Sequence, residues 1–147
     1  MLGLLFSILT GPRGACKKKN MEKRIYYHDT DAGGVVYYGN YLKYLEEART
    51  EFLENKGLSI KILHEKGFLY AVRQCQLTYK SPARYGETVV CDAQLTRMTA
   101  VQMFFTQKIW DKESGALRVE AEVALVSLDK NFKPTPIPDD IKAVLEG

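Results

Sequence analysis

The sequence contains few of the residues on which common catalytic and metal sites depend. It has two histidines, His28 and His64, and three cysteines, none of which belongs to a Cys-x-x-Cys pair. It also lacks the Gly-x-Ser-x-Gly, His-Glu-x-x-His and glycine-rich phosphate-binding motifs. A Ser-His-Asp hydrolase and a metal hydrolase are therefore poorly supported, and we expect no metal site.

Cysteine also gives no sign of a disulfide framework. Cys75 and Cys91 lie in apolar or strand-like runs, and Cys16 lies near the N-terminus. This pattern is typical of small buried thiols in a reducing compartment. We therefore expect a cytoplasmic protein without a structural zinc ion.

Excess charge is nearly absent once the first twenty residues are set aside. The formal net charge is +3, but Arg13, Lys17, Lys18 and Lys19 lie in that segment, which contains no acidic residue. The remaining residues carry slightly more acidic than basic side chains. The composition therefore predicts no binding of nucleic acid, which requires a basic surface.

A membrane-spanning run is also missing. The apolar stretch MLGLLFSILT has about ten residues, whereas a spanning helix needs ~20. Its basic residues follow the apolar run, which is the reverse of the usual signal-peptide order. We expect residues 1–20 to be an extension outside the fold, with an atypical signal or anchor and an ordered extra segment as alternatives. Residues 21–147 then form one domain without stable membrane insertion.

What the sequence does contain is one long amphipathic helical pattern. Between residues 41 and 56, apolar side chains recur at helical spacing, and lysine and glutamate fill much of the opposite side. Asn40 is a suitable N-cap and Gly57 a suitable C-terminal stop. A short helical turn is expected in SIKILHEKG, residues 59–67.

Alternating apolar and polar residues then predict β-strands. The short stretches MTA and DKESG suit hairpins between neighbouring antiparallel strands. The proline-rich KPTPIPDD ends the sheet, because proline cannot donate to a ladder. One helix against one curved sheet of about five strands in a meander is a two-layer α+β fold. The expected strands span residues 22–28, 68–80, 86–98, 101–111 and 116–129.

The chemistry of the chain is concentrated in YYHDTDAGGVVYYGN, residues 26–40. Asp29 and Asp31 precede two adjacent glycines, which leave the backbone amides of residues 33–38 accessible. These amides point with the positive end of the following helix dipole. Such an arrangement suits an anion, or a carbonyl oxygen that gains negative charge during a reaction.

Two segments give this pattern a specific resemblance. YYHDTDAGGVVYYGNYLKYLEEARTEFL and the later YKSPARYGETVV resemble the hotdog-fold acyl-CoA thioesterases of the 4-hydroxybenzoyl-CoA thioesterase type. They are most similar to the Tol-Pal-associated acyl-CoA thioesterase branch. The resemblance extends from Met21 to about Lys133. It implies a long helix wrapped by an antiparallel sheet, and hydrolysis of an acyl-CoA thioester.

Carried over residue by residue, the resemblance assigns the catalytic carboxylate to Asp31, as a general base or as a nucleophile. It places the backbone N–H of Tyr38 at the thioester carbonyl and the Tyr27 side chain in the pocket wall. Position 38 is histidine in many members of the Tol-Pal-associated branch and tyrosine in the hydroxybenzoyl type. Neither a metal nor a redox cofactor is required. The small or apolar residues that admit the acyl group are Gly33, Gly34 and Val35.

Coenzyme A phosphates need basic side chains near the mouth of the site. By charge alone, the candidates are Lys80, Arg84, Arg97, Lys108 and Arg118. The resemblance further implies that two subunits pair their sheets edge to edge, with the site at their interface, and that homodimers assemble into a homotetramer.

Several alternatives remain open at this point. Asp31 can be a turn residue that binds local amides, and Asp29 is expected to be a turn or cap residue. Glu46 and Glu47 are helix carboxylates of the kind that another thioesterase branch uses, although a solvated helix face explains them as well. A hotdog-fold hydratase or dehydratase, or a noncatalytic acyl-binding or envelope-machinery protein, would share the same fold.

Overall fold

The structure is a computed structural model, which describes residues 19–147. The predicted extension, residues 1–20, therefore lies almost entirely outside the described residues. The helices and strands in chain order are β1 (Met21–Arg24), the short 3₁₀ helix η1 (Tyr27–Asp29), α2 (Asn40–Glu54), α3 (Ile60–Glu65), β2 (Leu69–Tyr79), β3 (Thr88–Cys91), β4 (Gln94–Met98), β5 (Gln102–Asp111), β6 (Leu117–Leu128) and α4 (Asp139–Glu146).

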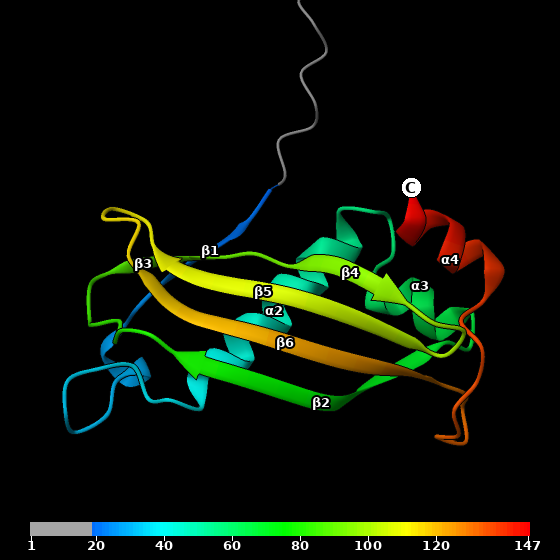
Figure 1. Cartoon of the computed structure of the whole chain (residues 1–147), viewed down its shortest axis with the longest axis horizontal. Coiled ribbons are helices and arrows are strands. Elements are labelled where there is room, and N and C mark those ends of the chain that lie inside the picture. Colours follow the sequence, from blue (N-terminus) through cyan, green and yellow to red (C-terminus); the bar gives the residue numbers. More distant parts are fainter. Residues whose placement is uncertain (1–18) are drawn as a thin grey trace, which may run out of the picture.

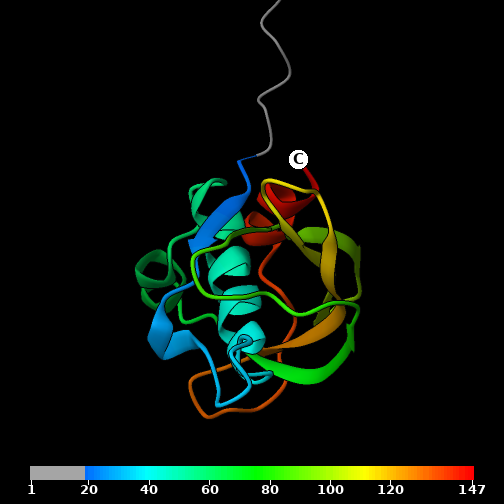
Figure 2. The same ribbon diagram turned by 90° about the vertical axis from the view of Figure 1, so that its left-hand side faces the viewer.

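The strands form one antiparallel sheet that covers one side of α2. Its order is β1-β3-β5-β6-β2, and β4 also pairs with β5. Figure 1 shows α2 behind the sheet and running along the long strands. The view in Figure 2 shows the strands curving around this helix. The predicted two-layer α+β arrangement is confirmed.

The apolar side of α2 packs on the inner face of the sheet. Tyr41, Leu45 and Ala48 are buried at the helical spacing that the sequence predicts. The ring of Phe52 packs edge-on against that of Phe105, with centroids 5.4 Å apart. Burial of apolar surface contributes ~25 cal/mol per Å². The apolar contact between α2 and the inner face of the sheet is therefore what holds the helix on the sheet. The inner face supplies Met103, Phe105, Ile109, Val119, Ala121, Val123 and Leu125.

The predicted strand order is wrong. β2 does not pair with β3, its successor in the chain, but with β6, and β3 pairs with β1 and β5. After Tyr79 the chain crosses to the far side of the sheet before β3 begins. Alternation identifies which residues form strands, but it contains no information on which strands are neighbours. The two predicted hairpins, β4–β5 and β5–β6, are confirmed.

Two strand boundaries also differ from the prediction. The strand expected over residues 22–28 ends at Arg24, because η1 follows it at Tyr27. The strand expected over residues 86–98 is divided into β3 and β4, which pair with successive parts of β5. Asp92 lies at the break, where its Oδ1 accepts from the Lys108 amide at 2.6 Å.

The ends of α2 are close to those predicted. Gly39 is the N-cap, and the predicted cap Asn40 is instead the first helical residue. After the helix, Gly57 has a φ of +78°, a conformation that favours glycine. The predicted turn in residues 59–67 contains α3, whose N-cap is Ser59. The C-terminal α4 was not predicted. It has eight residues and only two buried side chains, Ile141 and Leu145, which is too few to make a clear helical pattern in the sequence.

Candidate active site

The segment between η1 and α2 forms a tight hairpin that carries Asp31. The Asp31 amide donates to the carbonyl of Val35 at 2.9 Å, and the Gly34 amide donates to the carbonyl of Asp31 at 3.0 Å. The Tyr37 amide donates to the carbonyl of Asp29 at 2.9 Å. The hairpin leaves the Asp31 side chain exposed. A carboxylate is therefore held by backbone hydrogen bonds just before the start of the long helix.

The two glycines have separate roles in this hairpin. Gly34 has a φ of +77°, which side chains rarely adopt. A Cβ added at Gly33 would lie 3.2 Å from Asp31 Oδ1, which accepts a hydrogen bond from the Gly33 amide at 2.8 Å. Gly34 therefore permits the turn, and Gly33 permits the close approach of the carboxylate to the backbone.

Contacts with the β2–β3 loop hold the hairpin on the body of the protein. The Val36 amide donates to the carbonyl of Ala83 at 2.9 Å, and Val35 forms an isolated bridge with Arg84. The amide of Ala83 in turn donates to the Tyr41 hydroxyl at 3.1 Å, within α2. The two segments that carry the sequence resemblance are thus in contact in the fold.

The Tyr38 amide lies immediately before the N-cap of α2. Within residues 19–147 this N–H donates to no other group, whereas the Tyr38 carbonyl accepts from the Tyr79 hydroxyl at 3.1 Å. The N-terminus of a helix carries a partial positive charge from its aligned peptide dipoles. The structure therefore places an available donor beside the Asp31 hairpin, at a position suited to a negatively charged oxygen.

Asp29 has a structural position. Its side chain is buried, and its Oδ2 accepts from the Tyr26 amide at 2.8 Å. Its carbonyl accepts from the Asn40 side-chain amide at 2.9 Å, which ties η1 to the first turn of α2. His28 Nε2 lies 3.7 Å from Asp29 Oδ1. Asp29 therefore orients the hairpin and does not present its carboxylate to solvent.

Exposed tyrosines accompany the hairpin. The Tyr27 side chain is 82% exposed and that of Tyr38 is 64% exposed. Groups of large exposed aromatic residues commonly mark contact surfaces. In a single chain Tyr27 does not form the wall of an enclosed pocket, so its predicted role requires a ligand or a second subunit. The exposed tyrosines are Tyr26, Tyr27, Tyr37, Tyr38, Tyr79 and Tyr85.

Three of the candidate phosphate-binding cations are linked near the β2–β3 loop. Glu87 Oε2 accepts from the Arg84 amide and from Arg118 Nη2, both at 3.1 Å. The Lys80 amide donates to the carbonyl of Arg118 at 2.8 Å. Arg84 is exposed and adjoins the glycine hairpin through its bridge with Val35. Arg118 contacts Glu87 at 3.1 Å and the Ser81 hydroxyl at 3.0 Å. Of these cations, Arg84 has the position nearest to the backbone of the hairpin, whereas Arg118 already serves local contacts. Lys80 Nζ lies 3.9 Å from a Glu120 oxygen, and Lys108 is exposed on β5.

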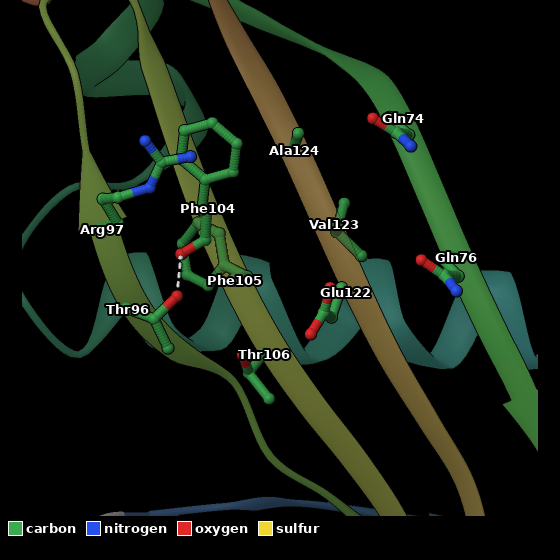
Figure 3. A pocket seen from close by; sticks show the side chains of 10 residues that line it. All are labelled: Gln74, Gln76, Thr96, Arg97, Phe104, Phe105, Thr106, Glu122, Val123 and Ala124. Atoms are coloured by element: carbon green, nitrogen blue, oxygen red, sulfur yellow. Dashed lines mark hydrogen bonds between the residues drawn. The ribbon is translucent and has the colours of Figure 1, made fainter.

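Arg97 lies on the outer face of the sheet, opposite α2. Figure 3 shows its guanidinium group over the Phe104 ring, with the helix behind the strands, and Arg97 Cζ lies 3.8 Å from the ring centroid. Thr96 and Thr106 line the same hollow of about 320 Å³. Within one chain the structure therefore does not bring Arg97 to the hairpin of Asp31.

A second pocket, of about 300 Å³, lies between α2, α3 and β2, and the sequence did not indicate it. Arg49 of α2 is one of its lining residues and is only 6% exposed. Burial lowers the pKa of Arg49 below its usual value. The spacing that turns Leu45 and Ala48 inward also turns residue 49 inward, so counting charges on the buried helix face would have found it.

The described part of the chain contains neither a metal-binding cluster nor a membrane-spanning helix. Within residues 19–147, no group of three His, Cys, Asp or Glu side chains is arranged to hold a metal ion. In the same residues, no helix is both long and apolar enough to cross a membrane.

Comparisons with known proteins identify relatives of the whole fold. Residues 26–145 match the family described as the Thioesterase-like superfamily. The acyl-CoA thioester hydrolase YbgC of Escherichia coli O6:H1 is 38% identical over 121 residues, which cover 82% of this chain and 90% of that protein. The acyl-CoA thioesterase YbgC of Haemophilus influenzae is 31% identical over 121 residues, covering 82% of this chain and 88% of that protein.

Solved structures agree with this relationship. A hypothetical protein from Thermus thermophilus superposes with a TM-score of 0.81 at 29% identity, covering 86% of this chain and 96% of that chain. The fold and the family match define the class of the protein as a hotdog-fold thioester hydrolase, which confirms the prediction of fold and enzyme class. The chain belongs to the Thioesterase-like superfamily.

Proposed function

We propose that the enzyme hydrolyses acyl-CoA thioesters to a free acid and coenzyme A, with Asp31 as the catalytic carboxylate. The observation that carries the proposal is the exposed carboxylate of Asp31 on a hydrogen-bonded hairpin that ends at the Tyr38 amide, which donates to no group within residues 19–147. The proposal is also supported by relatives that are named acyl-CoA thioester hydrolases. Within this class, we assign the enzyme to the 4-hydroxybenzoyl-CoA thioesterase type and its Tol-Pal-associated branch. This assignment depends on two segments, residues 26–53 and 79–90.

In the proposed reaction, the thioester carbonyl oxygen accepts a hydrogen bond from the Tyr38 amide. This donor and the α2 dipole stabilise the negative charge that develops on the oxygen, an effect worth ~3 kcal/mol for one donor. Asp31 either removes a proton from the attacking water or attacks the carbonyl carbon itself to form a mixed anhydride. In both routes the C–S bond breaks, and coenzyme A leaves and takes up a proton. In the second route water then hydrolyses the anhydride, which releases the free acid and restores the Asp31 carboxylate.

The remaining residues of the proposed site bind the substrate. Gly33, Gly34 and Val35 leave space for the thioester close to the backbone, and Tyr27 orients water or the acyl group. Arg84 adjoins the hairpin and is the preferred partner for a phosphate of coenzyme A. Lys80 is a second candidate, because it directly follows Tyr79, whose hydroxyl binds the Tyr38 carbonyl. Arg97 contributes only if a second subunit brings it near the hairpin.

We further propose that the enzyme is a cytoplasmic homodimer that assembles into a homotetramer. β2 lies at one end of the sheet order and has eleven residues, so a long row of backbone groups has no partner strand on that side among the described residues. Pairing of β2 with β2 of a second copy would satisfy these groups. The free thiols Cys75 and Cys91 are consistent with a reducing compartment.

The proposal is tested by incubating the purified protein with a panel of straight-chain and aromatic acyl-CoAs and a thiol reagent. We expect thiol release at a rate that is proportional to enzyme concentration, with the free acid confirmed by mass spectrometry. Tight binding of acyl-CoA without thiol release would instead identify a noncatalytic acyl-binding protein. Addition of water to an enoyl-CoA with the thioester intact would identify a hydratase.

A further inference from the structure

The pocket between α2, α3 and β2 is apolar on most of its surface. Its walls come from the two helices and from the start of the edge strand. A pocket of about 300 Å³ is large enough for a short acyl chain or a single aromatic ring. Its apolar lining residues are Ile60, Leu63, Phe68, Leu69, Val72 and Leu125.

Arg49 gives this apolar pocket an unusual donor. The Nη1 atom of Arg49 donates to Gln107 Oε1 at 2.8 Å, but its Nε is buried and has no hydrogen-bond partner. No carboxylate of residues 19–147 forms an ion pair with this side chain. Buried polar groups normally have partners, and an unpaired donor on a buried cation is costly. Among the described residues Gln107 is the only hydrogen-bond partner of the guanidinium, which lines the pocket and so retains donors for a ligand that carries an acceptor oxygen.

Glu46 restricts the charge of that oxygen. It lines the same pocket one helical turn before Arg49, and its Oε1 accepts from the Thr50 hydroxyl at 2.8 Å. The other two ionisable lining residues are His64, which is exposed, and Tyr70, which is half-buried. Because Glu46 offsets the positive charge of Arg49, a carboxylate on the ligand would gain little net attraction in the pocket, whereas a hydroxyl or keto oxygen could accept from Arg49 without repulsion. Arg49 and Glu46 together therefore favour a ligand whose acceptor oxygen is uncharged.

The proposed dimer brings a second hairpin close to this pocket. If the two-fold axis passes through the middle of β2, near Gln74, Tyr79 of the partner subunit lies opposite Leu69. The Tyr79 hydroxyl binds the Tyr38 carbonyl, so Tyr38 of the partner subunit accompanies it. A thioester held by that amide would then lie beside Leu69, which lines the pocket of the first subunit.

We infer that Arg49 determines substrate specificity, by binding a neutral hydroxyl or keto oxygen on the far part of the acyl group. This inference rests on the proposed function, because the acyl group enters the pocket from the thioester site. Arg49 supplies the hydrogen-bond donor, Glu46 disfavours an acidic end group, and the apolar walls hold the carbon chain.

The test compares octanoyl-CoA with its terminal hydroxy derivative and its terminal carboxy derivative. Turnover is measured on the wild type, and binding is measured by calorimetry on Asp31→Asn. We expect the hydroxy derivative to be preferred over octanoyl-CoA by roughly 10- to 100-fold, as for one hydrogen bond to a charged group. In Arg49→Met this preference should disappear while binding of octanoyl-CoA persists. In Glu46→Gln, use of the carboxy derivative should increase.

Equal use of the hydroxy derivative and octanoyl-CoA by the wild type, or an unchanged preference in folded Arg49→Met, would overturn the inference. If Arg49→Met does not fold, two other results test the inference: the order in which the wild type uses the three acyl-CoAs, and the use of the carboxy derivative by Glu46→Gln. Glu46→Gln is expected to fold, because Glu46 is exposed. If no thioester is hydrolysed, the proposed function fails, whereas the binding order still supports or overturns the role of Arg49.

Discussion

The glycine at position 34 connects backbone conformation with activity. Its φ of +77° favours glycine, and no atom lies within 4 Å of an added Cβ, so Gly34→Ala introduces strain without a clash. We expect a loss of about 1 kcal/mol in the free energy of unfolding, measured by urea denaturation, because L side chains disfavour this conformation. We also expect reduced thioester hydrolysis, because the altered turn moves Asp31.

The matched control for this substitution is Gly115→Ala. Gly115 has a φ of +73° and similar open space, but it lies in the β5–β6 hairpin. The control should lose similar stability and keep its activity. Equal activity of the two variants would show that the conformation of the Asp31 hairpin is not important for hydrolysis.

At the scale of single residues, the sequence predicts the hairpin of the proposed site but not the pocket that contains Arg49. Asp31, the glycines and Tyr38 lie within eight successive positions, so a local motif identifies them. Arg49 has no such motif, and its importance depends on burial against α3 and β2. The distance of Arg97 from the hairpin likewise depends on which face of the sheet its strand presents, which charge alone does not reveal.

The contact between α2 and the sheet includes a buried polar link at Gln107. Its Oε1 accepts from Arg49, and its Nε2 donates to the carbonyls of Leu45 and Asp92, both at 3.0 Å. Gln107→Leu would leave the Arg49 guanidinium without this partner. We expect a loss of about 3 kcal/mol in the free energy of unfolding, because an unpaired buried charge is costly.

Urea denaturation measures this loss, and two further variants control for it. Gln76→Leu makes the same chemical change at an exposed position of β2 and should change stability by less than about 0.5 kcal/mol. The double variant with Arg49→Leu should recover part of the loss, because the unpaired charge is removed. A Gln107→Leu variant as stable as Gln76→Leu would contradict a structural role for the link.

At the scale of elements, periodicity predicted α2 and the long strands to within a few residues. The apolar and polar sides of these elements differ enough to determine their type. The pairing of β2 with β6 was missed because tertiary contacts decide it. The break at Asp92 was missed because the apolar alternation continues across it, while the side chain of Asp92 binds β5.

For the whole molecule, the proposed two-fold pairing makes a direct prediction about Gln74. This residue is near the middle of β2, so Gln74→Lys would place two like charges close together at the axis. We expect the variant to dissociate at concentrations at which the wild type is a dimer or tetramer, as measured by sedimentation equilibrium. Activity should fall together with assembly.

The control is Gln76→Lys, which adds the same charge farther from the axis and should weaken assembly less. A wild-type protein that is monomeric and fully active would contradict the edge-to-edge dimer. It would also remove the route by which an acyl group reaches the Arg49 pocket.

The stability of the molecule should decrease at alkaline pH. Burial raises the pKa of Cys91 to about 12, from an ordinary value of 9.0, and burial also raises the pKa values of Tyr41 and Tyr70. Between these values the unfolded chain loses protons that the folded chain retains, so stability present below pH ~9 is lost as the pH rises. For Cys91 alone the slope is about 1.4 kcal/mol per pH unit.

Urea denaturation at a series of pH values measures this slope. Cys91→Ala should be less stable near neutrality, because it leaves a small cavity, but its alkaline slope should be smaller than that of the wild type. An unchanged slope in Cys91→Ala would contradict the contribution of this buried thiol.

Hydrolysis by the proposed mechanism depends most on the carboxylate of Asp31. The turnover of Asp31→Asn is compared with that of the wild type and of Asp139→Asn, which makes the same change at an exposed position of α4. We predict that Asp31→Asn remains folded and loses roughly 10²-fold or more in kcat on every acyl-CoA that the wild type accepts, while Asp139→Asn retains full turnover. Near-wild-type turnover of Asp31→Asn would contradict the account.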